Sequence, residues 1–382
     1  MGYSFIDLFC GCGGFSLGMQ KAGFRELASI DFDSHATDVF KYNFPTVGLV
    51  YTQDIATLNC SELVEAIHGQ SIDVIVGGPP CQGFSIARRV DGSNHGERVI
   101  VDSRRDLYKE YLRILAFIKP KAFVLENVLG IQTTLGGEYL NRIIIGAENL
   151  GYTISQFVVN VSDFSIPQKR KRVVLIGTKV VPFNLDYADM IAFGKNEPAM
   201  MLGEAIMDLP VLAAGEGMEV CDYDKVNREL HIKKYGTRFL EYFEIPNNGK
   251  LINHTSRPHN LRDLGDFQKL REGETSAQAL RRGEVLEFPY RRDYFTDRYT
   301  RQHREKLSST IVAHLSKDGL MFIHPTQNRS LTPREAARLQ SFPDWFAFPV
   351  PRTHQFKLIG NAIPPKLAYN LGQVLNDWLG KF

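Results

Sequence analysis

The first 180 residues alternate between short apolar runs and longer amphipathic segments. The apolar runs are nearly continuous and rich in β-branched residues, as expected for strands that are buried on both faces. The segments between them have the apolar spacing of helices. We predict strands at Tyr3–Phe9, Glu26–Asp31, Val47–Tyr51, Ile72–Gly77, Ala122–Glu126, Ile154–Asn160 and Val173–Gly177. We predict helices at Phe15–Gly23, Ser34–Phe44, Ser61–His68, Arg105–Ile118 and Glu138–Leu150.

Strands that alternate with helices at this spacing favour an α/β fold with a doubly wound, mostly parallel sheet. This rhythm ends near Pro182. Residues 183–325 form short, irregular segments that are rich in Gly and Pro and have no sustained period. We therefore expect a second, smaller and irregular domain after the α/β domain.

A regular pattern returns near the end of the chain. Residues 331–342 read as a helix with Thr332 as its cap and Pro333 in its first turn, and a second amphipathic helix starts near Pro365. The predicted domains are 1–182 plus 350–382 for the first, and 183–349, with the helix at 331–342, for the second.

The composition excludes several classes of protein. Of the 382 residues, 43% are hydrophobic and 23% are charged, which argues against global disorder, collagen and coiled coil. No run of 18 apolar residues predicts a membrane span, and the N-terminus lacks a basic segment and carries Asp7, so no signal peptide is expected. We expect a cytoplasmic protein whose cysteines are free thiols, at Cys10, Cys12, Cys60, Cys81 and Cys221.

The first predicted strand runs into a glycine-rich turn. In FIDLFCGCGG (5–14), Gly11, Gly13 and Gly14 let the backbone turn tightly and approach a ligand closely. Asp31 ends the second strand about 20 residues later, where a carboxylate can accept hydrogen bonds from ribose hydroxyls. This combination indicates a nucleoside-type cofactor, although a lone glycine turn is a weak signal.

Further residues refine the predicted cofactor. Asp54 could accept from an adenine amino group, and Phe9 and Phe32 could sandwich its ring; alternatively, both rings are core residues and Asp31 is a cap. Residues 1–60 hold six Asp/Glu against three Lys/Arg, so the site suits a cationic cofactor without phosphates. S-adenosylmethionine, with its sulfonium and ammonium groups, fits that description.

A candidate nucleophile follows the fourth predicted strand. The segment GGPPCQGFS (77–85) places Cys81 beyond a strand's carboxyl end, the edge at which ligands bind in open α/β sheets. Glu126 emerges one strand over, where a carboxyl could act as a hydrogen-bond partner or acid. Arg170 and Arg172, at i and i+2 near a strand start, would face one side and could orient a planar substrate, unless this is a solvated basic edge.

Six motifs together resemble the DNA cytosine-5 methyltransferase family of the bacterial restriction–modification type. They occur in the family's order, from one end of the chain to the other: FIDLFCGCGG, GGPPCQGFS, LENV, PQKRKR, RSLTPREAARLQSFP and GNAIPP. The resemblance implies the Rossmann-like fold of class I S-adenosylmethionine-dependent methyltransferases. It also implies that 183–325 belongs to a variable target-recognition region braced by 331–342.

The resemblance assigns roles to individual residues. Cys81 would be the nucleophile, Glu126 would engage N3 and N4 of the target cytosine, Arg172 would contact its O2, Arg170 would support the site, and the Pro79 carbonyl would accept from N4. S-adenosylmethionine, which leaves as S-adenosylhomocysteine, would be bound by Phe9, Gly11, Gly13, Gly14, Asp31, Phe32, Asp54 and Asn361. Arg104 would touch the target phosphate. Apart from the resemblance, we also expect DNA contacts from Gln82, Ser85, Arg88, Arg291 and Arg292.

Charge supports a nucleic-acid partner. Residues 251–306 hold 12 Lys/Arg against 9 Asp/Glu, with aromatic residues interleaved. The expected partner is double-stranded DNA, bound by a monomer, with a cognate restriction enzyme acting separately and no membrane. The sequence does not reveal which DNA site is recognised.

Other functions fit less well. A tRNA cytosine methyltransferase would carry a Cys-Phe-Thr signature that this chain lacks, and an NAD-type oxidoreductase would have a G-x-G-x-x-G turn. A non-catalytic DNA-binding relative would not need Cys81, Glu126 and Arg172. Metal binding by His254 and His259 is compatible with their spacing, but no cysteine lies nearby, so we expect no metal site.

Overall fold

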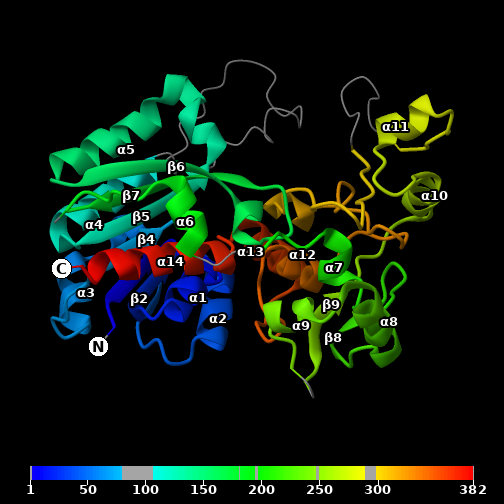
Figure 1. The fold of residues 1–382 in the computed structure, drawn as a ribbon, viewed down its shortest axis with the longest axis horizontal. Helices are drawn as coiled ribbons and strands as arrows, with labels where there is room; N and C mark the ends of the chain where they lie inside the picture. Colours follow the sequence, from blue (N-terminus) through cyan, green and yellow to red (C-terminus); the bar gives the residue numbers. More distant parts are fainter. Residues whose placement is uncertain are drawn as a thin grey trace. The chain divides into compact units, whose positions relative to one another are not determined.

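The predicted alternation of strands and helices is present in the computed structural model, which describes residues 2–79, 106–179, 181–193, 197–246, 249–288 and 298–381 (Figure 1). The chain forms two units. Unit 1 comprises Met1–Phe164, Lys171–Asn196 and Ile363–Phe382, and unit 2 comprises Ser165–Arg170 and Glu197–Ala362.

Unit 1 contains a seven-stranded sheet in the order β3-β2-β1-β4-β5-β7-β6. Neighbouring strands among β1 to β5 pair in parallel, whereas β7 is antiparallel to both β5 and β6. The carboxyl ends of β1 to β5 and the amino end of β7 therefore meet at one edge. The strands are β1 (Ser4–Leu8), β2 (Arg25–Asp31), β3 (Val50–Thr52), β4 (Val74–Gly77), β5 (Ala122–Val128), β6 (Thr153–Asn160) and β7 (Lys171–Thr178).

Helices complete the layers of unit 1 and confirm the predicted α/β class. Residues of α3, α4 and α5 share one hydrophobic core with the strands, and α14 packs along α1 (Figure 1). The helices are α1 (Gly14–Lys21), α2 (Ser34–Asn43), α3 (Cys60–Ala66), α4 (Leu107–Ile118), α5 (Glu138–Asn149), α6 (Tyr187–Phe193) and α14 (Pro365–Leu379).

Unit 2 is more regular than the sequence predicted. A two-stranded antiparallel sheet and several short helices occupy the stretch expected to be irregular. The helices escaped prediction because most have only five or six residues, and because α8 buries only His231 and so carries no apolar stripe. The elements are α7 (Leu202–Ile206), β8 (Gly217–Cys221), α8 (Lys225–Tyr235), α9 (Arg238–Tyr242), β9 (Leu251–Thr255), α10 (Leu261–Lys269), α11 (Ser276–Arg281), α12 (Pro333–Leu339) and α13 (Arg352–Asn361).

The unit boundaries differ from the predicted domain boundaries of 182 and 350. Helix α6, after Pro182, belongs to unit 1, and α13, after position 350, belongs to unit 2. The segment Ser165–Arg170 also belongs to unit 2, although both flanking segments lie in unit 1. These exchanges depend on long-range contacts, which a local hydrophobic pattern does not encode.

Helix α12, predicted at 331–342, begins with a capping box. The Thr332 side chain accepts from the Glu335 backbone N–H, and the Glu335 carboxylate accepts from the Thr332 backbone N–H at 2.7 Å. Both Glu335 oxygens also accept from Arg329, at 2.7 and 2.8 Å. Burial raises the pKa of Glu335, but the charge and hydrogen bonds of Arg329, together with His324 and His254, outweigh burial and lower this pKa to about 2.

Two arginines within α12 are fully buried. Arg338 lies between two buried carboxylates and donates to both Asp208 and Asp344. Arg334 donates to three main-chain carbonyls, including that of Ile252 on β9. Buried charges are tolerated when they are paired and hydrogen-bonded, so α12 ties distant segments of unit 2 together.

Among the residues that the structure describes, no helix has both the length and the apolar character to span a membrane.

The contact between α1 and α14 depends on Gly18. A Cβ built there would lie 2.4 Å from the Ala368 Cβ and 2.4 Å from the Tyr369 backbone nitrogen. We predict that Gly18→Ala lowers the free energy of unfolding by about 1–3 kcal/mol, because the helices must move apart. Urea unfolding would measure this change. Gly48→Ala is the matched control, since its Cβ would meet nothing within 4 Å, and an equal loss in both variants would contradict the argument.

Candidate functional site

The glycine turn connects β1 to α1 and leaves open space on one side. Gly11 and Gly13 have positive φ values of 54° and 94°, a conformation that favours glycine. A Cβ on Gly13 would lie 2.4 Å from the Phe44 ring, whereas a Cβ on Gly11 would meet nothing within 4 Å. Gly14 is the first residue of α1. The turn is therefore packed against the Phe44 ring at Gly13 and open at Gly11, as a ligand-binding turn requires.

Asp31 is bonded to the same turn. Its Oδ2 accepts from the Gly11 backbone N–H at 2.8 Å, and its Oδ1 accepts from the Asp33 N–H at 2.9 Å. The parallel pairing of β1 with β2 brings this carboxylate to the turn, since Leu8 lies opposite Ile30. The structure thus joins two signals that are separated by about 20 residues in the sequence.

The other predicted cofactor residues of unit 1 lie beside this turn or follow β3. Phe32, next to Asp31, is 65% exposed, a large apolar surface left open to a ligand. Phe9 is half-buried against the core and has a φ of 65°. Asp54 is exposed, and its Oδ1 accepts from the Ala56 N–H at 2.9 Å.

Two carboxyl groups, Asp7 buried and Glu26 partly buried, lie behind the turn, and the sequence analysis missed them. The Ser16 hydroxyl on α1 lies 2.9 Å from Asp7 Oδ2 on β1 and 2.6 Å from Glu26 Oε1 on β2. Ser29 also donates to Glu26 Oε1, and Gln20 Nε2 donates to Glu26 Oε2 at 2.6 Å. The only signal for this cluster was a charged residue, Asp7, inside an apolar strand.

Burial dominates the electrostatics of this pair. Burial, and then the neighbouring Glu26, raises the pKa of Asp7 well above its usual value. Burial likewise raises the pKa of Glu26 to about 7, although three hydrogen bonds oppose this shift. The pair therefore has a proton to exchange near neutral pH.

A second group of polar side chains lies at the ends of β4 and β5. Glu126 is 8% exposed, and Asn127 is buried beside it. The Asn127 Nδ2 donates to the Pro79 carbonyl at 3.2 Å, and a Cβ on Gly78 would lie 3.4 Å from Glu126 Oε2. The segment after β4 is thus held against β5, with a buried carboxylate facing it.

Arg172 joins this group because β7 is antiparallel to β5. The register places Arg172 opposite Val128, so the start of β7 meets the end of β5. The Arg172 Nε lies 2.8 Å from Glu126 Oε1, and its Nη1 donates to the Lys171 carbonyl at 2.8 Å. The Nε–H is not aimed at the carboxylate, and no described group donates a hydrogen bond to Glu126 Oε1.

Arg170 has a different environment from Arg172. It belongs to unit 2, and its guanidinium donates to the carbonyls of Ile311 at 2.8 Å, Ala362 at 3.2 Å and Gly360 at 3.4 Å. This geometry favours a supporting role over direct contact with a substrate. Asn361, the last residue of α13, also belongs to unit 2, so unit 1 by itself does not bring it to the glycine turn.

The remaining predicted site residues lie outside the described residues. They are the candidate nucleophile and the candidate DNA contacts, Cys81, Gln82, Ser85, Arg88, Arg104, Arg291 and Arg292.

Burial makes two other thiols poor nucleophiles. Burial raises the pKa of Cys12 to about 12, and burial followed by Asp31 raises the pKa of Cys10 well above its usual value. A cysteine reacts as its thiolate, so both are far less reactive than an accessible thiol.

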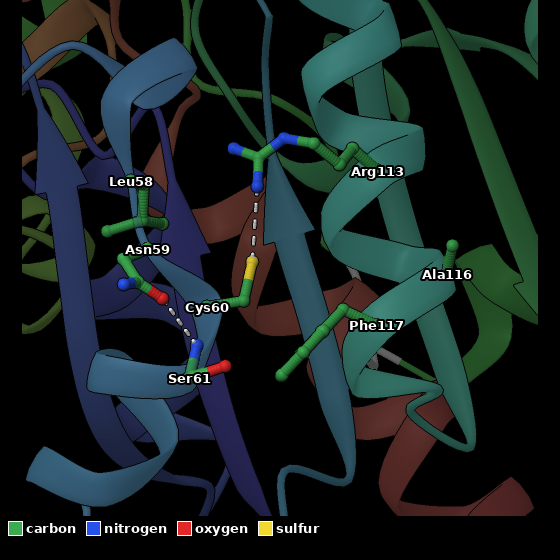
Figure 2. A pocket seen from close by; sticks show the side chains of 7 residues that line it. All are labelled: Leu58, Asn59, Cys60, Ser61, Arg113, Ala116 and Phe117. Carbon is green, nitrogen blue, oxygen red and sulfur yellow. Dashed lines mark hydrogen bonds between the residues drawn. The ribbon is translucent and has the colours of Figure 1, made fainter.

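A shallow groove lies between α3 and α4 (Figure 2). Its volume is about 460 Å³. The Arg113 side chain points at Cys60, with its Nη1 3.4 Å from the sulfur, and its Nη2 donates to the Ile55 carbonyl at 3.0 Å. The groove contains no predicted site residue, but Arg113 anchors the segment that follows Asp54.

The two histidines considered as metal ligands form hydrogen bonds within unit 2. His254 Nε2 lies 2.9 Å from the Pro210 carbonyl and His259 Nε2 lies 3.1 Å from the Ser330 hydroxyl. Over the described ranges, no three potential ligand side chains gather into a metal site.

Comparisons with known proteins agree with this geometry. The family model described as C-5 cytosine-specific DNA methylase matches residues 3–377. The Type II methyltransferase M.DdeI of Desulfomicrobium norvegicum is 34% identical, over 96% of this chain and 87% of its own length. The Type II methyltransferase M1.HphI of Haemophilus parahaemolyticus is 33% identical, over 98% of this chain and 87% of its own length.

Solved structures show the same fold. The crystal structure of a DNA modification methyltransferase encoded within a prophage of E. coli matches with a TM-score of 0.76 and 29% identity, over 99% of this chain and 100% of that chain. The S. pombe Dnmt2 methyltransferase matches with a TM-score of 0.59 at 16% identity, over 99% of both chains, a likeness of fold alone.

The buried thiols yield a direct test. We predict that iodoacetamide at pH 7.5 leaves Cys10 and Cys12 unlabelled in the folded protein, because burial keeps both thiols protonated and inaccessible. Peptide mass spectrometry would report each site, and labelling in urea provides the control in which every cysteine reacts. Labelling of either residue before unfolding would show that the glycine turn is more open than the structure indicates.

Proposed function

Because the chain belongs to the C-5 cytosine-specific DNA methylase family and is a DNA (cytosine-5) methyltransferase, we propose how its residues perform the reaction. The enzyme transfers a methyl group from S-adenosylmethionine to C5 of a cytosine that is flipped out of a specific double-stranded DNA sequence. The reaction passes through a covalent bond between Cys81 and C6 of the base.

The observation that carries the proposal is the environment of Glu126. This carboxylate is buried, it lies beside Arg172, and one of its oxygens receives no hydrogen bond from the described residues. A buried acceptor without a donor is costly unless a ligand supplies the donor. The N4 amino group of cytosine is such a donor, and the Pro79 carbonyl is a second acceptor nearby.

The chemistry explains why these groups are needed. C5 of cytosine is too weak a nucleophile to attack a methyl group directly. Addition of the Cys81 thiolate to C6 turns C5 into an enamine carbon. Glu126 stabilises the charge that develops at N3, and Arg172 holds O2. After methyl transfer, loss of the C5 proton and expulsion of Cys81 restore the aromatic ring.

The glycine turn fits S-adenosylmethionine, which would supply the methyl group. Asp31 is placed to accept from the ribose hydroxyls, and the exposed Phe32 ring offers a face for adenine. Asp54 and Phe9 would complete the adenine contacts, and the resemblance to the family adds Asn361 as a further cofactor residue. No cation contacts Asp7 or Glu26 among the residues described, so the local charge favours a cationic cofactor.

Unit 2 is the proposed target-recognition part. Flipping a base out of the duplex costs a few kcal/mol, which contacts with phosphates and grooves must offset. These contacts would come from Arg88, Arg104, Arg291 and Arg292, together with Gln82 and Ser85. The buried arginines of α12 would hold the described segments of unit 2 together.

The biological setting follows from the relatives. We propose that the enzyme acts as a monomer on host DNA in the bacterial cytoplasm, where it is associated with the nucleoid while bound. In a restriction–modification system, a cognate restriction enzyme would act separately on unmethylated sites.

The proposed cofactor contact can be tested at Asp31. We predict that Asp31→Ala weakens S-adenosylmethionine binding by about 1.5–3 kcal/mol, the range for a hydrogen bond to a charged group. Isothermal titration calorimetry would measure the loss. Asp38→Ala, at an exposed position of α2, is the matched control. Equal affinities for both variants would assign Asp31 to capping the turn alone.

The covalent mechanism can be tested with 5-fluorocytosine at the target position of a duplex. Cys81 should add to C6 and C5 should accept the methyl group, but fluorine cannot leave as a cation. We therefore predict a covalent protein–DNA adduct that survives denaturing electrophoresis. Cys81→Ser should abolish this adduct, because a serine hydroxyl is not ionised near neutral pH.

The control variant is Cys221→Ser, which changes a half-exposed thiol in unit 2 and should trap like the parent enzyme. Trapping on fluorinated RNA instead of DNA would identify an RNA enzyme. Methyl transfer to a verified DNA site without any adduct would rule out the thiolate mechanism.

A further inference from the structure

A buried carboxyl group and a partly buried one share one hydroxyl behind the glycine turn. The Ser16 Oγ lies 2.9 Å from Asp7 Oδ2 and 2.6 Å from Glu26 Oε1, so both contacts have hydrogen-bond length. A serine hydroxyl carries a single proton and can donate to only one of these oxygens. The other contact needs a proton on a carboxyl group, which then donates to Ser16. The geometry therefore favours a proton on one carboxyl of the pair.

Among the described residues, no positively charged side chain neutralises the two carboxyl groups in place of this proton. Among the described residues, the side-chain contacts of Asp7 and Glu26 are to Ser16, Gln20 and Ser29, all of them uncharged. Asp31 and the thiols of the turn add only negative or neutral groups. The other titratable side chains on α1, α2, β2, β3 and α14 are Lys21, Arg25, His35, Asp38, Lys41, Tyr42, Tyr51, Lys366, Tyr369 and Asp377, and Tyr111 of α4 also interacts with Asp7.

None of these side chains contacts either carboxyl group. Burial raises the pKa of both acids, to about 7 for Glu26, in agreement with a retained proton. Because the two groups interact, the proton belongs to the pair and not to one residue.

The pair lies on the same side of the sheet as the proposed ribose-binding carboxylate. Asp7 is opposite Ser29 in the parallel register of β1 and β2, so their side chains share a face. Asp31 follows Ser29 by two residues and projects to that face as well. Asp7, Glu26 and Asp31 thus form a group of carboxyl groups around the glycine turn.

We propose that the Asp7–Ser16–Glu26 chain holds one exchangeable proton and releases it to solvent when the cationic cofactor binds, so that the pair favours S-adenosylmethionine over the neutral-sulfur product. This inference rests on the proposed cofactor. The pair gains one negative charge, which attracts the sulfonium of S-adenosylmethionine. S-adenosylhomocysteine lacks the sulfonium charge and gains less from this change. The pair is a specificity determinant for the charge of the cofactor.

The expected size follows from Coulomb's law. One charge gained by the carboxyl pair, at roughly 10 Å from a sulfonium in an effective dielectric of about 20, changes the affinity for that cation about tenfold. We predict that the ratio of S-adenosylmethionine to S-adenosylhomocysteine affinity rises about five- to tenfold from pH 6 to pH 8 in the parent enzyme. Glu26→Gln keeps the shape of the side chain and removes its titration. The affinity ratio of this variant should therefore lack this roughly five- to tenfold rise between pH 6 and pH 8.

Calorimetry in buffers of different ionisation enthalpy would count the protons released. Comparing the same ligand with both proteins cancels the ligand's own titration. The control is Glu148→Gln, which changes an exposed carboxylate on α5 and should behave like the parent enzyme. Equal proton release and equal affinity ratios in the parent enzyme and Glu26→Gln would overturn the linkage.

A measurement without cofactor separates this inference from the proposed function. A folded-state pKa raised from 4.5 to about 7 adds stability below pH 4.5 that is lost as pH rises to about 7. Urea unfolding of the ligand-free parent should therefore show this loss, and Glu26→Gln should not. If the unfolding free energies of the parent and of Glu26→Gln depend on pH in the same way, the shared proton is overturned, even if S-adenosylmethionine binds. A difference between the profiles, with no binding of S-adenosylmethionine, would support the proton and overturn the cofactor assignment.

Discussion

The parallel pairing of β1 to β5 is the constraint on which the candidate site depends. Parallel strands end at the same edge of the sheet. Residues that are far apart in the sequence therefore meet at that edge. Asp31 reaches the glycine turn in this way, and Glu126 reaches the segment after β4. The helices on both faces keep this sheet buried, which is why its strands are continuous apolar runs.

One antiparallel strand completes the site. Because β7 runs against β5, its first residues lie at the edge where the parallel strands end. Arg172 therefore faces Glu126, and the site gains a guanidinium that a wholly parallel sheet would have placed at the opposite edge. The direction of a single strand thus decides whether a cation and a carboxylate meet.

The two units bury charge in opposite ways. In unit 2, carboxylates and carbonyls surround Arg329 and the two arginines of α12, so these charges hold the fold together. In the described part of unit 1, Asp7 and Glu26 have hydroxyl and amide partners and no cationic one. An unneutralised pair costs stability when it ionises, which is the expected signature of a functional group and not of a structural one.

The sequence by itself determined most of unit 1. The apolar runs predicted its seven strands to within a few residues, because strands buried on both faces leave a strong local pattern. The turn, Asp31, Glu126 and the cap of α12 were also readable, since each depends on residue types at short spacing. The family followed from the order of six motifs.

Tertiary structure decided the rest. The short helices of unit 2 are held by long-range contacts and leave no period, and Ser165–Arg170 joined unit 2 for the same reason. Arg170 and Arg172, two residues apart, received different partners because the chain passes between units at that point. The pairing of Asp7 with Glu26 was invisible in the sequence, because it depends on β1, α1 and β2 converging around one serine hydroxyl.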